Sequence, residues 1–167
     1  MTITTFNTLS QHERQKNLFN CCGATRWVKK MMQAFPFENK EALLNAAKKN
    51  WQACSENDWL EAFQHHPRIG DVKSLAKKYS DTARWAKNEQ GAVEAAPLKT
   101  IEALAEGNRL YEEKFGFIFI VCATGKSAAA MLQLLGDRLK NERNEELKIA
   151  AAEQEKITEL RLQKLLT

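Results

Sequence analysis

The sequence predicts an all-α fold, a single compact multi-helix domain, and three observations support this expectation. Its 167 residues include 22 Ala and 18 Leu but only 7 Ile and 4 Val, a bias that favours helices over strands. With 7 Gly and 3 Pro, the chain is poor in the residues that form turns. The length and a hydrophobic share of 44% suit one globular domain over residues 1–167.

Capping residues and helix breakers set the expected boundaries of the first two helices. Ser10 and Glu13 have the spacing of a capping box at the start of one helix, and Gly23 suits its end. Thr25 is expected to cap the next helix, which runs to the residue before Pro36. Both helices follow from local residue preferences alone.

The same kinds of residue bound the helices that follow. A third helix is expected over residues 39–51, beginning at an Asn cap. Ser55 caps a short fourth helix, which must end near His66 because the following Pro67 disfavours helical geometry there. The starts of two further helices are predicted at Asp71 and Asp81.

The second half of the chain combines long helices with one segment that is not helical. Pro97 precedes a helix over residues 98–114, whose apolar positions recur at helical spacing, and Gly116 ends it. The apolar run Phe117-Ile-Phe-Ile-Val-Cys122 is too short for a helix of its own, so we expect a buried extended segment over about residues 117–123. Two closing helices are predicted over residues 127–140 and from 142 to the end.

Charge, cysteine and hydropathy patterns exclude several functions. The net charge of +4 comes from 25 basic and 21 acidic residues spread along the chain, without the basic block that nucleic-acid binding needs. The four cysteines lack CxxC spacing, so they are expected to be reduced and packed and to hold no metal. We find neither an apolar run of the roughly 18–20 residues that span a membrane nor a signal peptide, and expect a cytoplasmic protein.

Residues 123–127 end like a phosphate-binding loop. That loop also needs a Gly five residues before its Gly-Lys pair, and here Ile120 stands at that position. Capping of the following helix by Ser127 is the better interpretation.

His66 is the main candidate for chemistry that the residues themselves suggest. Pro67 ends the helix at His66, and Gly70 permits a tight turn after it. An imidazole at the end of a helix lies near the negative end of the dipole, which favours its protonated form and suits a general acid. The alternative is that His65 and His66 are simply exposed in a turn, and spacing does not decide between the two.

Two further positions are weaker candidates. Glu89 and Gln90 adjoin a Gly in a region that equally suits an exposed helix. Arg161 shares a largely apolar helix face with Leu147, Ala150, Gln154, Ile157 and Leu165. A buried guanidinium needs an internal carboxylate or a bound anion, whereas the alternative is a stem that packs while its head reaches water.

Taken in order, these motifs resemble one protein family along nearly the whole chain. They are His66-Pro-Arg-Ile-Gly-Asp71, Glu89-Gln90, Phe115-Gly-Phe-Ile-Phe-Ile-Val-Cys-Ala123, Arg138, Asn144-Glu-Glu-Leu147 and Ile157-Thr-Glu-Leu-Arg-Leu162. In these residues the chain resembles the 2-oxo-4-hydroxy-4-carboxy-5-ureidoimidazoline (OHCU) decarboxylases of urate breakdown, which yield S-allantoin.

The resemblance implies a cofactor-free, all-helical decarboxylase that is usually a homodimer and acts on a small molecule. It implies that His66 is the catalytic acid/base and that Glu89 is its catalytic partner. The substrate-binding residues implied in the same way are Pro67, Ala86, Lys87, Asn88, Gln90, Phe119, Ile120, Val121, Cys122, Ala123 and Arg161. Ala86 departs from the family, which often has Ser there, and Arg138 rivals Arg161 as the group that binds the substrate anion.

Two other classes of function compete with this interpretation. A non-catalytic helical interaction module would use its tryptophans as core or as partner anchors; these are Trp27, Trp51, Trp59 and Trp85. A hydrolase acting on the ureido group would need an activated water or nucleophile, and the sequence shows no metal cluster or Ser-His-Asp arrangement to supply one.

Overall fold

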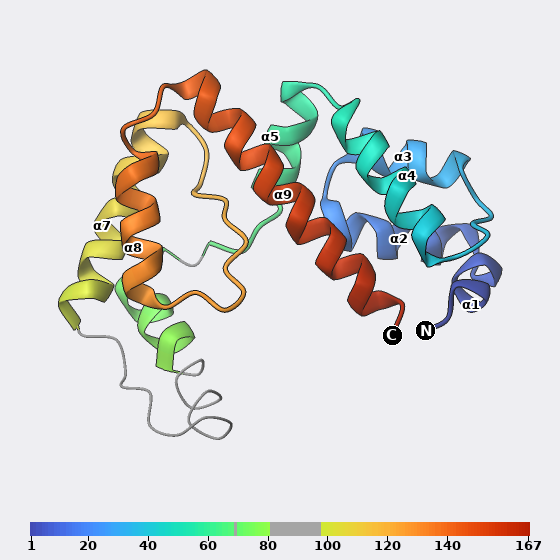
Figure 1. Ribbon diagram of the computed structural model, residues 1–167, viewed down its shortest axis with the longest axis horizontal. Coiled ribbons are helices and arrows are strands. Elements are labelled where there is room, and N and C mark those ends of the chain that lie inside the picture. Colours follow the sequence, from blue (N-terminus) through green and yellow to red (C-terminus); the bar gives the residue numbers. More distant parts are fainter. Residues whose placement is uncertain (69, 81–97) are drawn as a thin grey trace. The chain divides into compact units, whose positions relative to one another are not determined.

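The computed structural model describes residues 1–68, 70–80 and 98–167, and these residues form helices joined by turns, without any strand (Figure 1). The all-α prediction is therefore confirmed. The helices are α1 (Ile3–Thr8), α2 (Gln11–Cys22), α3 (Thr25–Gln33), α4 (Lys40–Gln52), α5 (Glu56–Gln64), α7 (Leu98–Phe115), α8 (Ala128–Arg138) and α9 (Arg143–Leu165). Residues 72–80 are also helical. Within the described part of the chain, every helix is too short or too polar to cross a membrane.

Local capping determines where most of these helices begin. The Ser10 hydroxyl accepts a hydrogen bond from the Glu13 N–H, and the Glu13 carboxylate accepts one from the Ser10 N–H, which completes the predicted capping box of α2. Side-chain oxygens of Asn39 and Ser127 cap α4 and α8. Gly23 ends α2 at φ 81°, in the left-handed region that favours glycine. The boundaries predicted at these positions are confirmed.

The predicted N-cap at Thr25 is wrong. The residue at the cap of α3 is Ala24, which makes no side-chain cap, and Thr25 is the first helical residue. Its N–H and hydroxyl instead donate to the Glu61 carboxylate at 3.0 and 2.6 Å. A carboxylate on α5, distant in sequence, thus replaces the local cap and ties α3 to α5.

The chain divides into two compact units, and each unit combines distant parts of the sequence. Unit 1 comprises Met1–His66, Ile120–Cys122 and Leu147–Thr167. Unit 2 comprises Pro67–Phe119 and Ala123–Glu146. Helix α9 therefore contributes its first turn to unit 2 and its remaining length to unit 1.

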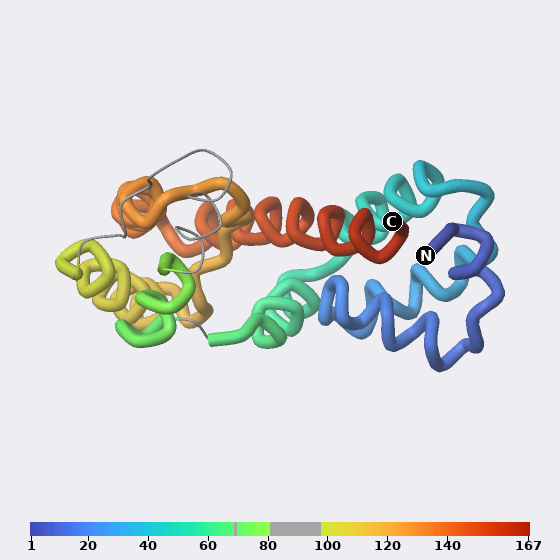
Figure 2. Tube along the Cα trace, turned by 90° about the horizontal axis from the view of Figure 1, so that it is seen from below, coloured from blue at the N-terminus to red at the C-terminus, as the bar shows by residue number. Residues whose placement is uncertain are grey.

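Unit 1 is built around α3, which packs against α2, α4 and α5. Trp27 and Trp51 are buried in this unit and Trp59 is half-buried, whereas Trp85 lies outside the described residues. The Trp51 indole N–H donates to the Ala151 carbonyl oxygen at 2.9 Å, which fastens α4 to α9. The chain ends lie side by side (Figure 2), where the Met1 ammonium donates to the Thr167 carbonyl oxygen at 2.6 Å.

Unit 2 contains the closely packed pair of α7 and α8. Gly107 allows this contact, because a Cβ at that position would lie 2.5 Å from the Leu135 Cδ2 atom. Tyr111 and Phe115 on α7 are buried, and their ring centroids are 4.6 Å apart. Gly116 ends α7 as predicted, at φ 79°.

The segment after α7 is not helical, in agreement with the sequence. Residues 118–123 have no regular secondary structure. Phe117 and Ile120 are buried, whereas the other positions are half-buried. The segment is therefore not helical, as predicted, but its burial is uneven.

Candidate functional site

His66 lies just beyond α5, at a point where the chain is held against the end of α2. His65 is the C-cap of α5, and its ring meets the Phe19 ring edge-on with 4.7 Å between centroids. A Cβ on Gly23 would lie only 2.8 Å from the His65 Cβ. This close packing fixes the backbone immediately before His66.

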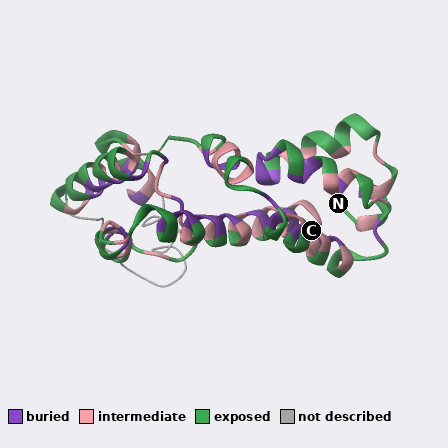
Figure 3. Cartoon of the chain, turned by 90° about the horizontal axis from the view of Figure 1, so that it is seen from above, coloured by how far each residue is buried: buried purple, intermediate pink, exposed green. Residues whose placement is uncertain are grey.

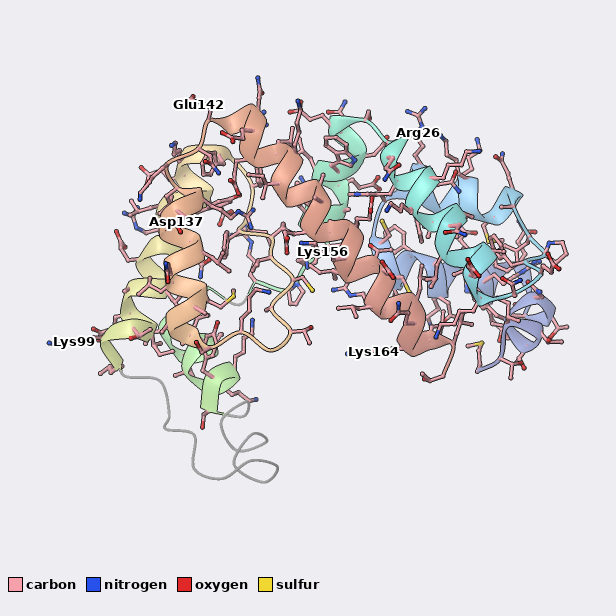
Figure 4. The ribbon with its side chains drawn as sticks, viewed as in Figure 1. Arg26, Lys99, Asp137, Glu142, Lys156 and Lys164 are labelled. Atoms are coloured by element: carbon pink, nitrogen blue, oxygen red, sulfur yellow. The ribbon has the colours of Figure 1, made fainter. Side chains whose placement is uncertain are left out.

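A chain of hydrogen bonds runs from His66 into unit 1. The Nε2 atom of His66 bonds with Oε1 of Gln154, and Nε2 of Gln154 donates to Oγ1 of Thr158 at 3.1 Å. The Thr158 side chain also hydrogen-bonds with the thiol of Cys22. Gln154 is 0% and Thr158 5% exposed, so their polar atoms depend on these partners. Lys156 marks this stretch of α9 in Figure 4.

Burial keeps the His66 imidazole neutral. Desolvation lowers the pKa of His66, and the charge of Arg161 lowers it further, although the hydrogen bond with Gln154 acts in the opposite direction. The prediction of a protonated imidazole at a helix end is therefore wrong. His65, rather than His66, occupies the C-cap, and loss of hydration outweighs any effect of the helix dipole.

Arg161 places a positive charge beside this imidazole. Its Nη1 atom donates to the Cys21 carbonyl oxygen at 3.2 Å, and its side chain is half-buried. Over residues 1–68, 70–80 and 98–167, no carboxylate forms an ion pair with this guanidinium. Burial raises the pKa of the Cys21 thiol to about 11, and Arg161 opposes that rise. The guanidinium therefore acts electrostatically on both His66 and Cys21.

The buried face of α9 differs slightly from the predicted one (Figure 3). Its buried positions are Glu146, Leu147, Ala150, Ala151, Gln154, Thr158 and Leu162. Ile157 and Arg161 lie beside this line and are half-buried. The predicted face is shifted by one residue in its second half, because spacings of three and four residues both fit a helical period of 3.6.

Arg138 has a different environment from Arg161. It is 7% exposed and forms an ion pair with Glu146, which is fully buried. Its Nη2 atom donates to the Tyr111 hydroxyl at 3.3 Å, and its guanidinium lies 4.5 Å from the centroid of the Phe119 ring. The charge of Arg138 is thus balanced inside unit 2 by an acid of its own.

The non-helical segment contributes to both units. Ile120, Val121 and Cys122 belong to unit 1, where the Cys122 N–H donates to the Glu153 carboxylate at 2.7 Å. This backbone donor is therefore occupied by α9. Phe119, in unit 2, packs against Tyr111 with 5.2 Å between ring centroids.

The remaining predicted site residues fall into two groups. Pro67 and Ala123 belong to unit 2. The positions outside the described residues are Ala86, Lys87, Asn88, Glu89 and Gln90.

The sequence interpretation missed three polar residues on α9, which are Gln154, Thr158 and Glu153. A helical period of 3.6 places Gln154 and Thr158 on one face of α9, among residues that are otherwise apolar. Two adjacent polar positions on a buried face signal a hydrogen-bonded group. Neither position reveals that its partner lies on a segment far away in the sequence.

The cysteines of this chain are unpaired thiols. All four cysteines are free, and burial raises the pKa of Cys22 to about 12 and that of Cys54 to about 11. In the described ranges, no group of three or more His, Cys, Asp or Glu side chains is arranged to hold a metal ion.

The chain is similar to a set of known proteins with related names. A family model described as OHCU decarboxylase matches residues 7–163. The uric acid degradation bifunctional protein TTL of Arabidopsis thaliana is 44% identical over 146 residues, which cover 87% of this chain and 45% of that protein. A 2-oxo-4-hydroxy-4-carboxy-5-ureidoimidazoline decarboxylase of Xenopus laevis is 40% identical over 99 residues, covering 58% of this chain and 55% of that protein. The chain thus spans about half the length of these two relatives.

Solved structures show the same similarity. A crystal structure of an OHCU decarboxylase in the presence of (S)-allantoin matches with a TM-score of 0.72 and 38% sequence identity, covering 89% of this chain and 95% of that one. A crystal structure of (S)-allantoin synthase matches with a TM-score of 0.69 and 17% identity, covering 98% and 54% of the two chains. The second match concerns the fold alone.

Proposed function

Because this chain belongs to the OHCU decarboxylase family, we propose that it converts OHCU to (S)-allantoin in urate breakdown. One observation connects this proposed function with particular residues. A neutral, half-buried His66 lies within electrostatic reach of Arg161, whose guanidinium has no carboxylate partner in the described part of unit 1. A base beside an uncompensated positive charge suits a substrate that carries both an acidic proton and a carboxylate.

The reaction itself makes modest demands on a protein. Decarboxylation breaks the bond between the ring carbon and the carboxylate, and its electron pair forms a C=C bond while the adjacent C=N bond takes up a proton at nitrogen. The hydroxyl then loses its proton and becomes the carbonyl, and the neighbouring carbon gains a proton that fixes the S configuration. The substrate's own C=N bond is the electron sink, so orientation and proton transfer remain for the chain.

Each step has a proposed residue. His66 is neutral and accepts the hydroxyl proton as general base, and Arg161 binds the substrate carboxylate. Glu89, outside the described residues, delivers the proton that sets the configuration. The other residues that we propose to contact the substrate are Pro67, Ala86, Lys87, Asn88, Gln90, Phe119, Ile120, Val121, Cys122 and Ala123. With the Cys122 N–H bonded to Glu153, the contact at Cys122 is made through its other atoms.

Arg161 is a better candidate for the anion than Arg138 on electrostatic grounds. Arg138 is paired with the buried Glu146, so an added anion would compete with an existing partner. Arg161 bonds to a neutral carbonyl oxygen, which leaves its charge available. A homodimer in the cytoplasm, acting without a cofactor, completes the proposal, and light scattering during size-exclusion chromatography tests the dimer.

Circular dichroism of the allantoin formed from freshly generated OHCU tests the proposed function. OHCU decays by itself to racemic allantoin, so optical activity, rather than product formation, is the signal. Wild-type protein is expected to give optically active S-allantoin, and His66→Ala is expected to lose about 10²–10⁴-fold in kcat. Racemic product at the buffer rate with wild-type protein would overturn the proposal and favour the helical interaction module.

A further inference from the structure

Gln154 is the polar residue that lies between His66 and the interior of unit 1. It is 0% exposed, and both ends of its amide group are engaged, one with His66 and one with Thr158. We propose that Gln154 is a positioning residue that holds His66 as its Nε2–H tautomer and leaves Nδ1 as the nitrogen that accepts the substrate proton. The catalytic half of this inference rests on the proposed function.

The direction of the hydrogen-bond chain carries the argument. The Gln154 Oε1 atom can only accept, so the His66 Nε2 atom that bonds with it must carry the hydrogen. The Gln154 Nε2 atom donates to the Thr158 hydroxyl oxygen, which leaves the Thr158 hydrogen for the Cys22 sulfur. Each group therefore donates to the next, from the imidazole to the thiol.

The reverse orientation of the amide would break this order. An amide NH₂ facing His66 would need the Thr158 hydroxyl to donate to Gln154 and the Cys22 S–H to donate to Thr158, and a thiol is a weaker donor than a hydroxyl. Burial raises the pKa of the Cys22 thiol to about 12, so this sulfur stays protonated and adds no charge. Because these side chains are almost fully buried, water does not replace a lost bond.

A neutral imidazole has one N–H, so fixing that hydrogen on one nitrogen fixes the base on the other. Three side chains face the ring or act on its charge: Gln154 and Arg161 on α9, and His65 on its own segment. Arg161 and His65 lower the pKa of His66, in the same direction as its burial, which keeps the ring neutral. Gln154 then decides which neutral form is present.

The ring ¹⁵N chemical shifts of histidine-labelled protein report which nitrogen carries the hydrogen. The chain has three histidines, and the signals missing in His66→Ala assign those of His66. At about pH 8, above the ordinary histidine pKa, the wild type is expected to show a protonated Nε2 and an unprotonated Nδ1. The opposite pattern would overturn the proposal, whatever reaction the protein catalyses.

Two substitutions of Gln154 separate its positioning role from simple packing. Gln154→Met keeps the side-chain length but removes the acceptor, so a mixture of tautomers and a fall in kcat of about 10–100-fold are expected, with KM little changed. Gln154→Glu keeps an acceptor and adds a negative charge, so the Nε2–H form is retained and the acidic limb of the kcat/KM profile moves to higher pH. Gln163→Met, on an outer position of the same helix, is the matched control. It is expected to change neither the tautomer of His66 nor kcat.

The outcomes distinguish this inference from the proposed function. If wild-type protein shows no stereoselective decarboxylation, the proposed function fails, while the ¹⁵N shifts still decide the tautomer. If Gln154→Met folds and keeps both the Nε2–H tautomer and the wild-type kcat, the positioning role fails. If Gln154→Met does not fold, Gln154→Glu decides instead. The positioning role then fails if the pH profile of kcat/KM in Gln154→Glu is the same as in the wild type.

Discussion

The two units each bury a polar cluster, and the two clusters differ in how completely they are satisfied. The Arg138 cluster in unit 2 consists of Tyr111, Arg138, Asn141 and Glu146. The His66 cluster in unit 1 consists of Cys22, His66, Gln154, Thr158 and Arg161. In the first cluster an acid balances the charge of the arginine, whereas in the second, within the described residues, the arginine has no carboxylate partner.

The Arg138 cluster closes around the Glu146 carboxylate. The Glu146 carboxylate accepts from Tyr111 at 2.5 Å, from Asn141 at 3.0 Å and from Arg138. Burial raises the pKa of Tyr111, so its hydroxyl stays protonated and donates. One positive and one negative charge cancel, which indicates a structural role.

The His66 cluster has no such balance. Arg161 is its one charged group in the described residues and donates to a backbone carbonyl oxygen, while His66 is neutral. A half-buried cation beside a half-buried base, without a carboxylate partner in the described residues, favours an anionic ligand. The comparison teaches that the number of buried polar residues does not distinguish the two clusters, whereas the balance of their charges does.

Removing Glu146 is expected to have the largest effect on stability. Glu146→Ala removes the carboxylate that pairs with the buried Arg138 guanidinium and should lower the free energy of unfolding by about 3–5 kcal/mol. Urea unfolding followed by circular dichroism measures this. Asp137→Ala is the control, because it breaks an exposed pair with Lys140 and should cost under about 1 kcal/mol. Equal losses in the two variants would show that the Arg138 cluster is not closed in the way described.

Substituting one glycine in each unit is expected to have an intermediate effect on stability. Gly23→Ala forces a left-handed residue to carry a Cβ, which costs about 1–2 kcal/mol, and pushes against His65 next to His66. Gly107→Ala crowds the flexible end of Leu135 and should cost about 1–3 kcal/mol.

The two glycine variants differ in what they should do to catalysis. Steady-state kinetics at a temperature where both are folded should show a lower kcat for Gly23→Ala alone. A similar fall in kcat for Gly107→Ala would argue against placing the catalytic base in unit 1.

The sequence predicts most of this fold because its helix boundaries are local. Ser10, Asn39, Ser55 and Ser127 each bond with residues three positions away, and each was predicted correctly. Thr25 was not, since its partner Glu61 is 36 residues distant and no local rule reaches that far.

The candidate site shows the same limit. His66 and Arg161 were singled out from the sequence, but the Gln154 partner of His66 is 88 residues away. The protonation state of His66 was predicted wrongly, because helix ends can be recognised from sequence while burial depends on the whole unit. Local sequence can therefore identify a candidate residue, whereas tertiary structure determines its protonation state and its partners.

The pH dependence of unit 1 is expected to give the smallest effect. The folded pKa of His66 lies below its unfolded value, so the unfolded chain binds more protons as the pH falls. The contribution of His66 to stability is therefore fully present above the ordinary histidine pKa and is lost as the pH falls through the folded pKa. Urea unfolding measures the free energy of unfolding across this pH range. In His66→Ala, this free energy should no longer show the part of the pH dependence that comes from His66. An unchanged profile would mean that His66 is not buried as a neutral base.

Substitution of Arg161 tests the central claim, an unbalanced charge held for the substrate, most directly. In Arg161→Met, the KM for OHCU should rise about 10–100-fold, as expected for the loss of a charged hydrogen bond. The free energy of unfolding should stay close to the wild-type value, in contrast to Glu146→Ala, because the partner left behind is a neutral carbonyl oxygen and not a buried charge. An unchanged KM with a lower kcat, or a loss of stability as large as that of Glu146→Ala, would contradict the claim.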